Sequence, residues 1–258
     1  MALVETHCFS ETLGMSTSFM AILPQPTSSK QIGMPGAART GPHPTLYLLH
    51  GLSDDHTTWC RRTNLERYVS ELGIAVIMPN AHRSFYTNMA HGERYFDFIA
   101  DELPQLARSF FHLSDQREHN HIAGLSMGGY GAFKVGMRRP NLFSSATSLS
   151  GVMDVANIDR WFKNEATKNN VFGSPDKVRG SDDDLFHLIE NSSSPRPRLL
   201  QICGTEDFLY EENLKFKKAL NTQSWDYTYH EEPGHHTWDF WDRNIQRALN
   251  WMFDEKRS

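Results

Sequence analysis

The sequence predicts an α/β fold in which a mostly parallel central sheet is flanked by helices. From residue 45 onward, segments that favour strands alternate with segments that favour helices, an order typical of parallel sheets. The strand segments are short and continuously apolar, as expected where helices cover both faces of a sheet. A chain of 258 residues with 39% hydrophobic content is able to bury one core, so we expect a single domain over residues 1–258.

The expected elements follow in chain order. Two strands at 6–13 and 16–23 form an N-terminal hairpin around a turn at Gly14, and a Pro- and Gly-rich loop follows over 24–44. Further strands are expected at 45–49, 74–78, 119–123, 144–149, 198–203 and 226–229. Helices are expected at 58–72, 97–111, 130–138, 209–220 and 237–253.

Two segments are expected to depart from regular structure. Pro104 falls inside the helix over 97–111, so it must lie near the start of that helix or kink it. Between residues 153 and 197 no clear strand is predicted, and aromatic side chains occur among polar ones. We interpret this segment as a partly helical insertion over the sheet edge and as a candidate partial lid, because long connections often carry function.

Charge and cysteine content argue against several classes of protein. The formal net charge of −5 is small and well mixed, without the basic stripe of a nucleic-acid-binding surface. No apolar run approaches the roughly 20 residues that cross a membrane, and the first residues do not resemble a signal peptide. Cys8, Cys60 and Cys203 are too few for a disulfide framework. We therefore expect a cytoplasmic protein that binds neither nucleic acid nor membranes.

Residues 124–128 fit the pattern G-x-S-x-G, with Ser126 at its centre. In this motif the serine occupies a sharp strand-to-helix turn that exposes its hydroxyl, and the glycines leave room for the turn. The alternative is a plain glycine-rich turn with a surface serine. Here an expected strand precedes the motif and a glycine-rich helix start follows it, so we predict that Ser126 is the nucleophile of an α/β-hydrolase fold.

A nucleophilic serine needs a base and an orienting acid, which in this fold follow it in the order serine, acid, histidine. The acid is expected after a late strand, where Glu206 and Asp207 are both candidates. The base is expected after the last strand, where His235 and His236 are both candidates. Asp207 also suits the N-cap of the helix over 209–220, so these residues leave the choice within each pair open.

An oxyanion hole needs two backbone N–H donors. One is expected from Met127, the residue after the nucleophile, and the other from Leu52, in the loop after the strand over 45–49. Gly51 permits the turn of that loop. We expect no metal site, because the chain has no HExxH motif and no paired C-x-x-C motifs.

Beyond these motifs the chain resembles the tributyrin esterase family, which belongs with the esterase D-like esterases. The resemblance extends from about residue 5 to residue 252 and rests on collinear segments at 48–51, 59, 62–64, 78–80, 86–87, 102–104, 124–131, 150–151, 203–204 and 207–210. It implies that the acid is Asp207, which stands immediately before Phe-Leu-Tyr. It also implies that the base is His236, two residues after Gly234 and two before Trp238.

The resemblance implies that the chain hydrolyses short-chain acyl esters through an acyl-enzyme intermediate, without a cofactor. An S-formylglutathione hydrolase or an acyltransferase would use the same three residues, whereas a non-catalytic binding protein would be expected to lack one of them. Relatives assemble as dimers or tetramers, so a homo-oligomer is also implied.

The substrate pocket is less well defined. The candidate pocket residues are Gly51, Trp59, Tyr86 and His235. The chain departs from the family pattern at residues 53–56 and 84–85, near the expected pocket. The resemblance therefore leaves the natural ester undefined.

Overall fold

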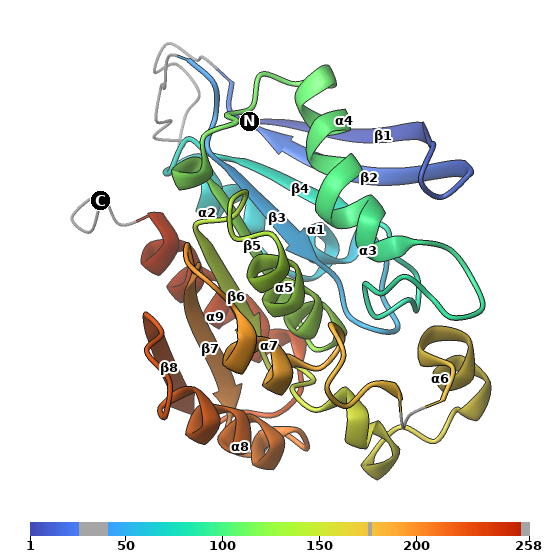
Figure 1. Ribbon diagram of the computed structural model, residues 1–258. Coiled ribbons are helices and arrows are strands. Elements are labelled where there is room, and N and C mark those ends of the chain that lie inside the picture. The colour runs from blue at the N-terminus through green and yellow to red at the C-terminus, as the bar shows by residue number, and fades with distance from the viewer. Residues whose placement is uncertain (26–40, 175–176, 254–258) are drawn as a thin grey trace.

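The central sheet has the strand order β1-β2-β4-β3-β5-β6-β7-β8 (Figure 1). This computed structural model describes residues 1–25, 41–174 and 177–253, so the loop expected over 24–44 lies largely outside the described residues. The strands are β1 (Ala2–Ser10), β2 (Met15–Leu23), β3 (Thr45–Leu49), β4 (Ala75–Pro79), β5 (Asn120–Leu125), β6 (Ser145–Leu149), β7 (Arg198–Gly204) and β8 (Tyr227–Glu232).

Most strands of the sheet run in one direction. β1 and β2 are antiparallel to their neighbours, and β3 to β8 are parallel to one another. The predicted mostly parallel sheet is thus confirmed. Because the carboxyl ends of the parallel strands meet at one edge, the loops that follow them lie together, where α/β proteins carry their binding sites.

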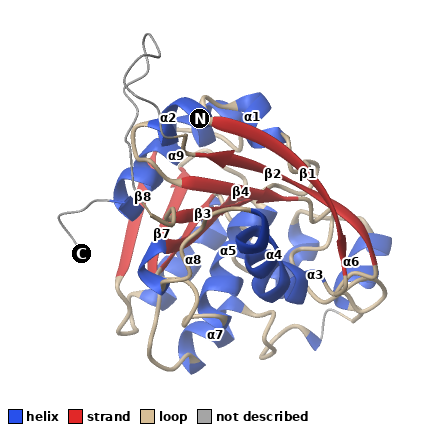
Figure 2. Ribbon diagram, turned by 90° about the horizontal axis from the view of Figure 1, so that it is seen from above, coloured by secondary structure: helices blue, strands red, loops and turns tan. Residues whose placement is uncertain are grey.

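Helices cover both faces of the sheet (Figure 2). One face carries α1 (Thr58–Arg62), α2 (Leu65–Ser70) and α9 (Trp238–Phe253). The other carries α3 (Tyr95–Asp97), α4 (Leu103–Phe110), α5 (Met127–Arg138), α7 (Leu185–Asn191) and α8 (Tyr210–Leu220). The flanking helices predicted from the sequence are therefore confirmed.

The strand β3 explains why the central strands are apolar at every position. Tyr47 and Leu49 belong to the core that includes α4 and α5, whereas Leu46 and Leu48 belong to the core that includes α2 and α9. Successive side chains of a strand point to opposite faces of a sheet. Both faces of β3 are buried, so the usual alternation of apolar and polar residues is absent.

The N-terminal hairpin forms, but its first strand ends at Ser10 rather than at residue 13. The carboxylate of Glu102 accepts hydrogen bonds from the Ser10 hydroxyl and from the backbone N–H groups of Glu11 and Thr12. These bonds hold the chain in a turn, with Gly14 at φ 65°. The strand end thus depends on a residue far along the chain, which local propensity does not reveal.

The helix expected over 58–72 divides into α1 and α2. Thr63 between them is extended, with φ −134° and ψ 170°, and its hydroxyl accepts a hydrogen bond from the N–H of Leu65. The carboxylate of Asp242 in α9 accepts a second bond from the N–H of Asn64, at 3.1 Å. The break is therefore fixed by a tertiary contact as well as by local bonds.

The helix expected over 97–111 begins earlier and is irregular. It consists of α3, the π-helical turn η1 (Phe98–Glu102) and α4, and Pro104 lies near the start of α4. Because α3, η1 and α4 follow one another without a break, Pro104 lies inside one helical stretch, directly after the π-helical turn, and the irregular turn coincides with the N–H that a proline lacks. A further 3-10 turn, η2 (Arg117–His119), precedes β5.

The segment expected as an insertion joins β6 to β7. Its elements are η3 (Val155–Arg160), α6 (Glu165–Phe172) and α7, and its described residues include no strand. In Figure 1, α6 lies at the side of the molecule, next to the loop that follows β4. There the N–H groups of Ala90 and His91 donate to the carbonyls of Val171 and Asn170, both at 2.9 Å.

Buried charged groups tie this insertion to the core. The Lys134 ammonium on α5 is fully buried and lies 2.9 Å from a carboxylate oxygen of Asp183. The Glu212 carboxylate on α8 accepts a hydrogen bond from the N–H of Met153, at 2.9 Å. Burial raises the pKa of Glu212 to about 7, because removal from water disfavours the charged form.

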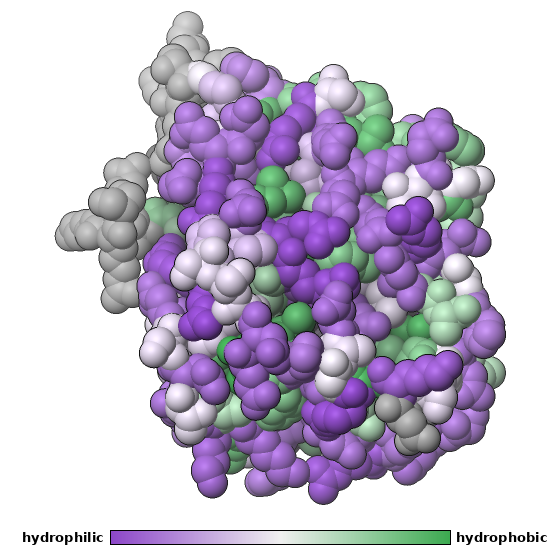
Figure 3. Space-filling view, in the orientation of Figure 1, coloured by the Kyte–Doolittle hydropathy of each residue, from purple (hydrophilic) through white to green (hydrophobic). Residues whose placement is uncertain are grey.

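The face of the molecule drawn in Figure 3 is mostly hydrophilic, and its hydrophobic residues form small separate patches. Among the described residues, no helix combines the length and the apolar character needed to cross a membrane. This face therefore resembles the solvent-facing surface of an ordinary globular domain.

We expect Glu212→Gln to raise the free energy of unfolding at alkaline pH. The amide oxygen still accepts the bond from Met153, and the buried charge is gone. Because the carboxyl pKa rises from 4.5 to about 7 on folding, wild-type stability falls as pH rises through that interval, and the penalty is complete above it. A shift of this size corresponds to about 3 kcal/mol.

Urea denaturation of both proteins between about pH 5 and pH 8.5 measures this difference. Glu211→Gln is the matched control, because Glu211 is the exposed neighbour on the same helix. Equal stability of wild type and Glu212→Gln at the alkaline end would contradict the prediction.

Candidate active site

Ser126 occupies the tight turn between β5 and α5. Its backbone has φ 54° and ψ −117°, a conformation that non-glycine residues keep only where the surrounding structure enforces it. A Cβ at Gly124 would lie 2.3 Å from the carbonyl oxygen of Gly128, and a Cβ at Gly128 would lie 2.5 Å from that of Leu49. Both glycines are therefore required by close backbone contacts. α5 begins at Met127, three residues before the helix expected from the sequence, so it starts directly after the serine.

The structure brings Ser126 together with one member of each candidate pair. His236 Nε2 lies 3.0 Å from Ser126 Oγ. His236 Nδ1 lies 3.0 and 2.8 Å from the Asp207 carboxylate oxygens Oδ1 and Oδ2. The Asp207 side chain is fully buried, so its charge acts on the imidazole with little screening by water. Asp207 also accepts a hydrogen bond from the N–H of Leu209 near the start of α8, so it caps this turn as well.

Glu206 and His235 make other contacts. The exposed Glu206 carboxylate accepts hydrogen bonds from the Thr205 hydroxyl and from the N–H of Gly234. The hydrogen bond from Thr205 and, to a smaller extent, the one from Gly234 hold the pKa of Glu206 below its usual value. His235 is exposed, and its Nδ1 lies 3.3 Å from the carbonyl oxygen of Glu206. In the described structure neither residue is hydrogen bonded to Ser126.

The loops that carry Asp207 and His236 touch through their backbones. A Cβ at Gly204 would lie only 2.1 Å from the carbonyl oxygen of Gly234. The N–H of Glu206 donates to that same oxygen at 3.1 Å. Glycine at position 204 thus allows the acid and the histidine to approach each other.

Aromatic rings surround the imidazole of His236. The ring of Phe208 lies 4.6 Å away and that of Trp241 lies 4.9 Å away, measured between centroids. Trp241 is held by a hydrogen bond from its indole N–H to the hydroxyl of Ser150, at 3.2 Å. These contacts restrict rotation of the imidazole and keep its Nε2 directed at the serine.

The loop after β3 is held by the buried side chain of His50. The N–H of Ala81 donates to His50 Nε2 at 3.0 Å, which leaves the ring proton on Nδ1, 2.7 Å from the carbonyl oxygen of Gly51. Burial lowers the pKa of His50 to about 4, so the ring is neutral at pH 7. The hydroxyl of Tyr86 donates to the carbonyl of His50 at 2.8 Å. The backbone that leads to Leu52 is therefore fixed on both sides.

Ser126 and His236 open onto a cavity of about 480 Å³ that Leu52 and Met127 also line. The rest of its wall is largely apolar and consists of Gly51, Ser53, Asp54, Phe85, Leu125, Val152, Trp161, Phe208, Thr237, Trp238 and Trp241. Phe208 and Trp238 stand beside the acid and the histidine in the sequence, so their position is readable from the motifs. Trp161 comes from the insertion, whose aromatic side chains are candidates for the pocket wall. Val152 directly precedes the insertion, and no sequence pattern indicated its position here.

Of the four candidate pocket residues, Gly51 lines this cavity and the other three do not. Trp59 is buried, and its indole N–H donates to the carbonyl of Leu49 at 3.1 Å. Tyr86 is buried behind the loop that follows β3, where its hydroxyl donates to the carbonyl of His50. His235 lies on the surface. Trp59 and Tyr86 thus support the loops around the cavity and do not line it.

This arrangement provides a serine hydroxyl and an imidazole at one cavity, with Leu52 and Met127 in the cavity wall. A hydroxyl hydrogen bonded to an imidazole that is in turn bonded to a carboxylate is the arrangement of serine hydrolases. The part of the chain that the structure describes holds no group of three or more His, Cys, Asp or Glu side chains that suits a metal ion.

Comparison with known proteins agrees with this arrangement. Residues 10–252 match the family described as "Putative esterase". This chain belongs to that family. An acetyl esterase of Caldicellulosiruptor saccharolyticus is 31% identical over 263 aligned positions, which cover 98% of each chain.

Solved structures support the same assignment. Fluorophosphonate-binding serine hydrolase F of Staphylococcus aureus is 37% identical, with a TM-score of 0.88 and 98% of each chain covered. An S-formylglutathione hydrolase of Staphylococcus aureus is also 37% identical, with a TM-score of 0.85 and the same coverage. The expected α/β-hydrolase fold and the expected function class are confirmed: this family member is a serine carboxylesterase.

We expect Gly204→Ala to separate the acid and histidine loops of this esterase. The added methyl group has no room beside the carbonyl of Gly234, and a displacement of about 1 Å at a catalytic group typically costs about 10² in rate. The value of kcat/KM for p-nitrophenyl acetate measures the loss. Thr205→Ala is the control, because it changes the next residue and keeps the backbone contacts. Wild-type activity in Gly204→Ala would refute the importance of this contact.

Proposed function

We propose that Ser126, Asp207 and His236 form the catalytic triad of an esterase that hydrolyses short-chain acyl esters through an acyl-enzyme intermediate. The observation that carries this proposal is the continuous chain of hydrogen bonds from Asp207 through His236 to the Ser126 hydroxyl, with distances of 2.8 and 3.0 Å. The strained backbone of Ser126, which places its hydroxyl at the floor of an apolar cavity, supports it further.

In the proposed reaction, Ser126 Oγ attacks the ester carbonyl carbon while His236 Nε2 takes the hydroxyl proton. The tetrahedral intermediate collapses when His236 gives this proton to the leaving alcohol, which departs and leaves the acyl group on Ser126. A water molecule then attacks the acyl carbon, and His236 takes its proton and returns it to Ser126 Oγ. Asp207 keeps the proton of neutral His236 on Nδ1 and stabilises the imidazolium that forms in each step.

We assign the oxyanion hole to the N–H groups of Leu52 and Met127. Both residues line the cavity beside Ser126, and Met127 begins α5, whose N-terminus favours a developing negative charge. The hydrogen bonds of His50 keep the Leu52 loop in place before substrate arrives. Such preorganised donors typically contribute about 10²–10³ each to the rate.

The small apolar cavity supports a short acyl group, as does the similarity to an acetyl esterase. A second candidate is hydrolysis of S-formylglutathione, because a structural relative of 37% identity bears that name. The same triad serves both reactions. Comparing kcat/KM for S-formylglutathione with that for p-nitrophenyl butyrate distinguishes them. A transferase would instead give a transacylated product when an alcohol acceptor is added.

We also make proposals about the domain organisation, the cellular location and the assembly of this protein. We infer one domain over residues 1–258, in which the segment 153–197 is an insertion that partly covers the site; Trp161 in the cavity wall supports this. A cytoplasmic location is supported by the three free thiols of Cys8, Cys60 and Cys203. Assembly into a homo-oligomer rests on the family resemblance, and light scattering tests it.

Ser126→Ala is expected to abolish esterase activity, with kcat for p-nitrophenyl acetate reduced by about 10⁴-fold or more. The variant keeps the fold, because an alanine in the turn loses only the hydroxyl. It also loses covalent labelling by a fluorophosphonate, which mass spectrometry of the intact protein measures. Turnover or labelling at the wild-type level would exclude Ser126 as the nucleophile.

Within each candidate pair, substitution of the two members is expected to have very different effects on esterase activity. Asp207→Asn leaves the imidazole in the wrong tautomer and is expected to lower kcat by about 10³–10⁴. Glu206→Gln keeps an acceptor for Gly234 and is expected to retain most activity. His236→Ala is expected to be inactive and His235→Ala active. The reverse order in either pair would reassign that member of the triad.

A further inference from the structure

A second cavity of about 670 Å³ lies next to the active-site cavity. The two cavities share the wall formed by Leu52, Ser53 and Asp54. Leu52 is the residue to which we assign one oxyanion donor, so the second cavity begins at the reacting centre. An ester that is longer than its reacting group can extend into it.

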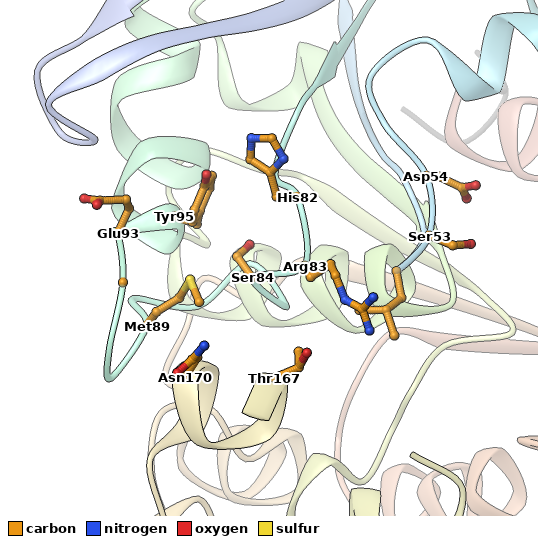
Figure 4. Close-up of a pocket in the computed structure, with 12 residues that line it drawn as sticks. Ser53, Asp54, His82, Arg83, Ser84, Met89, Glu93, Tyr95, Thr167 and Asn170 are labelled. Atoms are coloured by element: carbon orange, nitrogen blue, oxygen red, sulfur yellow. The ribbon is translucent and has the colours of Figure 1, made fainter. Parts of the chain in front are cut away.

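The second cavity differs from the first in its chemistry. Its wall is built from the loop after β4 and from the helix α6 of the insertion. Figure 4 shows Thr167 and Asn170 of α6 pointing upward toward Arg83 and Met89, whereas the Glu93 carboxylate points away from them. Thr167 and Asn170 thus add polar groups to the same cavity wall as Arg83.

Arg83 is a cation without an anionic partner among the described residues. Its guanidinium lies over the ring of Phe162, with 5.9 Å between the guanidinium carbon and the ring centroid. Other arginines are paired, among them Arg139, which binds Asp101 through two nitrogens at 2.7 Å, and Arg179, which binds two carboxylates. Arg83 therefore keeps its bidentate hydrogen-bonding face free for an anion in the cavity.

The loop that carries Arg83 is held in a strained conformation. His82, Phe85 and Tyr86 have φ values of 46°, 51° and 52°. Non-glycine residues keep such values where the structure enforces them, often at ligand sites. The Tyr86 hydroxyl binds the His50 carbonyl, and the buried Lys134 ammonium lies 3.3 Å from the carbonyl oxygen of Phe85. The backbone that carries Arg83 is thus fixed before any ligand binds.

The wall of the second cavity also contains two carboxylates, those of Asp54 and Glu93. Asp54 accepts a hydrogen bond from the N–H of Gly51, and burial raises its pKa. Its side chain points away from Arg83 in Figure 4, as does that of Glu93. Arg83 lines the second cavity only, whereas Asp54 belongs to the wall that both cavities share.

We propose that the second cavity binds a carboxylate at the far end of the ester substrate, with Arg83 as the specificity-determining residue. This inference rests on the proposed triad, because it concerns the substrate that the same Ser126 attacks. The carboxylate belongs either to the acyl part or to the alcohol part of the ester. The chemistry recognised by Arg83 is the same in both.

Two pairs of substrates test the proposal and separate these sources. The acyl pair is p-nitrophenyl hemiglutarate and the corresponding terminal amide. The alcohol pair is 4-acetoxybenzoate and 4-acetoxybenzamide. Within each pair a carboxylate is replaced by a carboxamide of nearly the same size. The ratio of kcat/KM for the acid to kcat/KM for the amide, divided by the same ratio for hydroxide hydrolysis without enzyme, reports recognition of the carboxylate.

We expect the wild-type enzyme to favour the acid in at least one pair, and Arg83→Gln to lower that ratio by about five- to tenfold, mainly through KM. Arg83→Lys keeps the charge but loses the bidentate contact, so its ratio lies between the two. Raising the salt concentration to about 1 M lowers the wild-type ratio and leaves that of Arg83→Gln unchanged. The pair that responds identifies which part of the ester carries the carboxylate.

Arg94→Gln is the matched control. Arg94 is an exposed arginine near the same loop that is already paired with Asp97, and it does not line the cavity. Its ratio should equal that of wild type. Turnover of neutral p-nitrophenyl acetate should be unchanged in Arg94→Gln, which shows that the reacting centre is intact.

The proposal is overturned if wild type favours the acid in neither pair, if Arg83→Gln leaves both ratios unchanged, or if Arg94→Gln lowers them equally. If Arg83→Gln fails to fold, the ratio of kcat/KM for the acid to that for the amide is measured with Arg83→Lys, and a wild-type ratio in that variant overturns the proposal. Failure of the triad is recognised separately, because Ser126→Ala would then retain activity toward the neutral esters.

Discussion

Close contacts between backbone segments determine where the reacting groups of this esterase lie. Gly124 meets Gly128 across the turn of the nucleophile, Gly128 meets Leu49 at the end of β3, and Gly204 meets Gly234 between the later loops. None of these contacts leaves room for a Cβ. Each proposed catalytic side chain stands within three residues of one of these glycines. Its position is therefore set by main-chain packing, which is stiffer than side-chain packing and suits a site that tolerates errors of only a fraction of an ångström.

The surroundings of His236 follow from the same packing. Its ring is enclosed by Phe208 and Trp241, and the Asp207 side chain beneath it is fully buried. Removal of water strengthens the attraction between the carboxylate and the imidazolium that forms during the reaction. His50 is the counterexample. It is more deeply buried than His236 and contacts backbone groups and no carboxylate, so it stays neutral and supports the loop that follows β3.

Much of this was predictable from the sequence, for identifiable reasons. The apolar strands and the G-x-S-x-G turn are local patterns, so the fold and Ser126 follow from them. Residues adjacent in sequence, such as His235 and His236, cannot be separated by pattern, and the family resemblance chose between them. Trp59 is buried behind a loop, which composition does not distinguish from a place in the pocket. The break between α1 and α2 depends on Asp242, a residue about 180 positions away.

The loop after β4 supports both the backbone of the β3 loop and the backbone that carries Arg83. Its Tyr86 hydroxyl holds the carbonyl of His50, and so supports the backbone that supplies one oxyanion donor. Its strained backbone also directs Arg83 toward the second cavity, and Lys134 fixes that backbone from below while binding Asp183 of the insertion. Arg83, to which we assign substrate selection, and the Leu52 amide, which we propose as an oxyanion donor, therefore share one support. A change in this support acts on kcat and on substrate preference together, whereas a change at the exposed Arg83 side chain acts on preference alone.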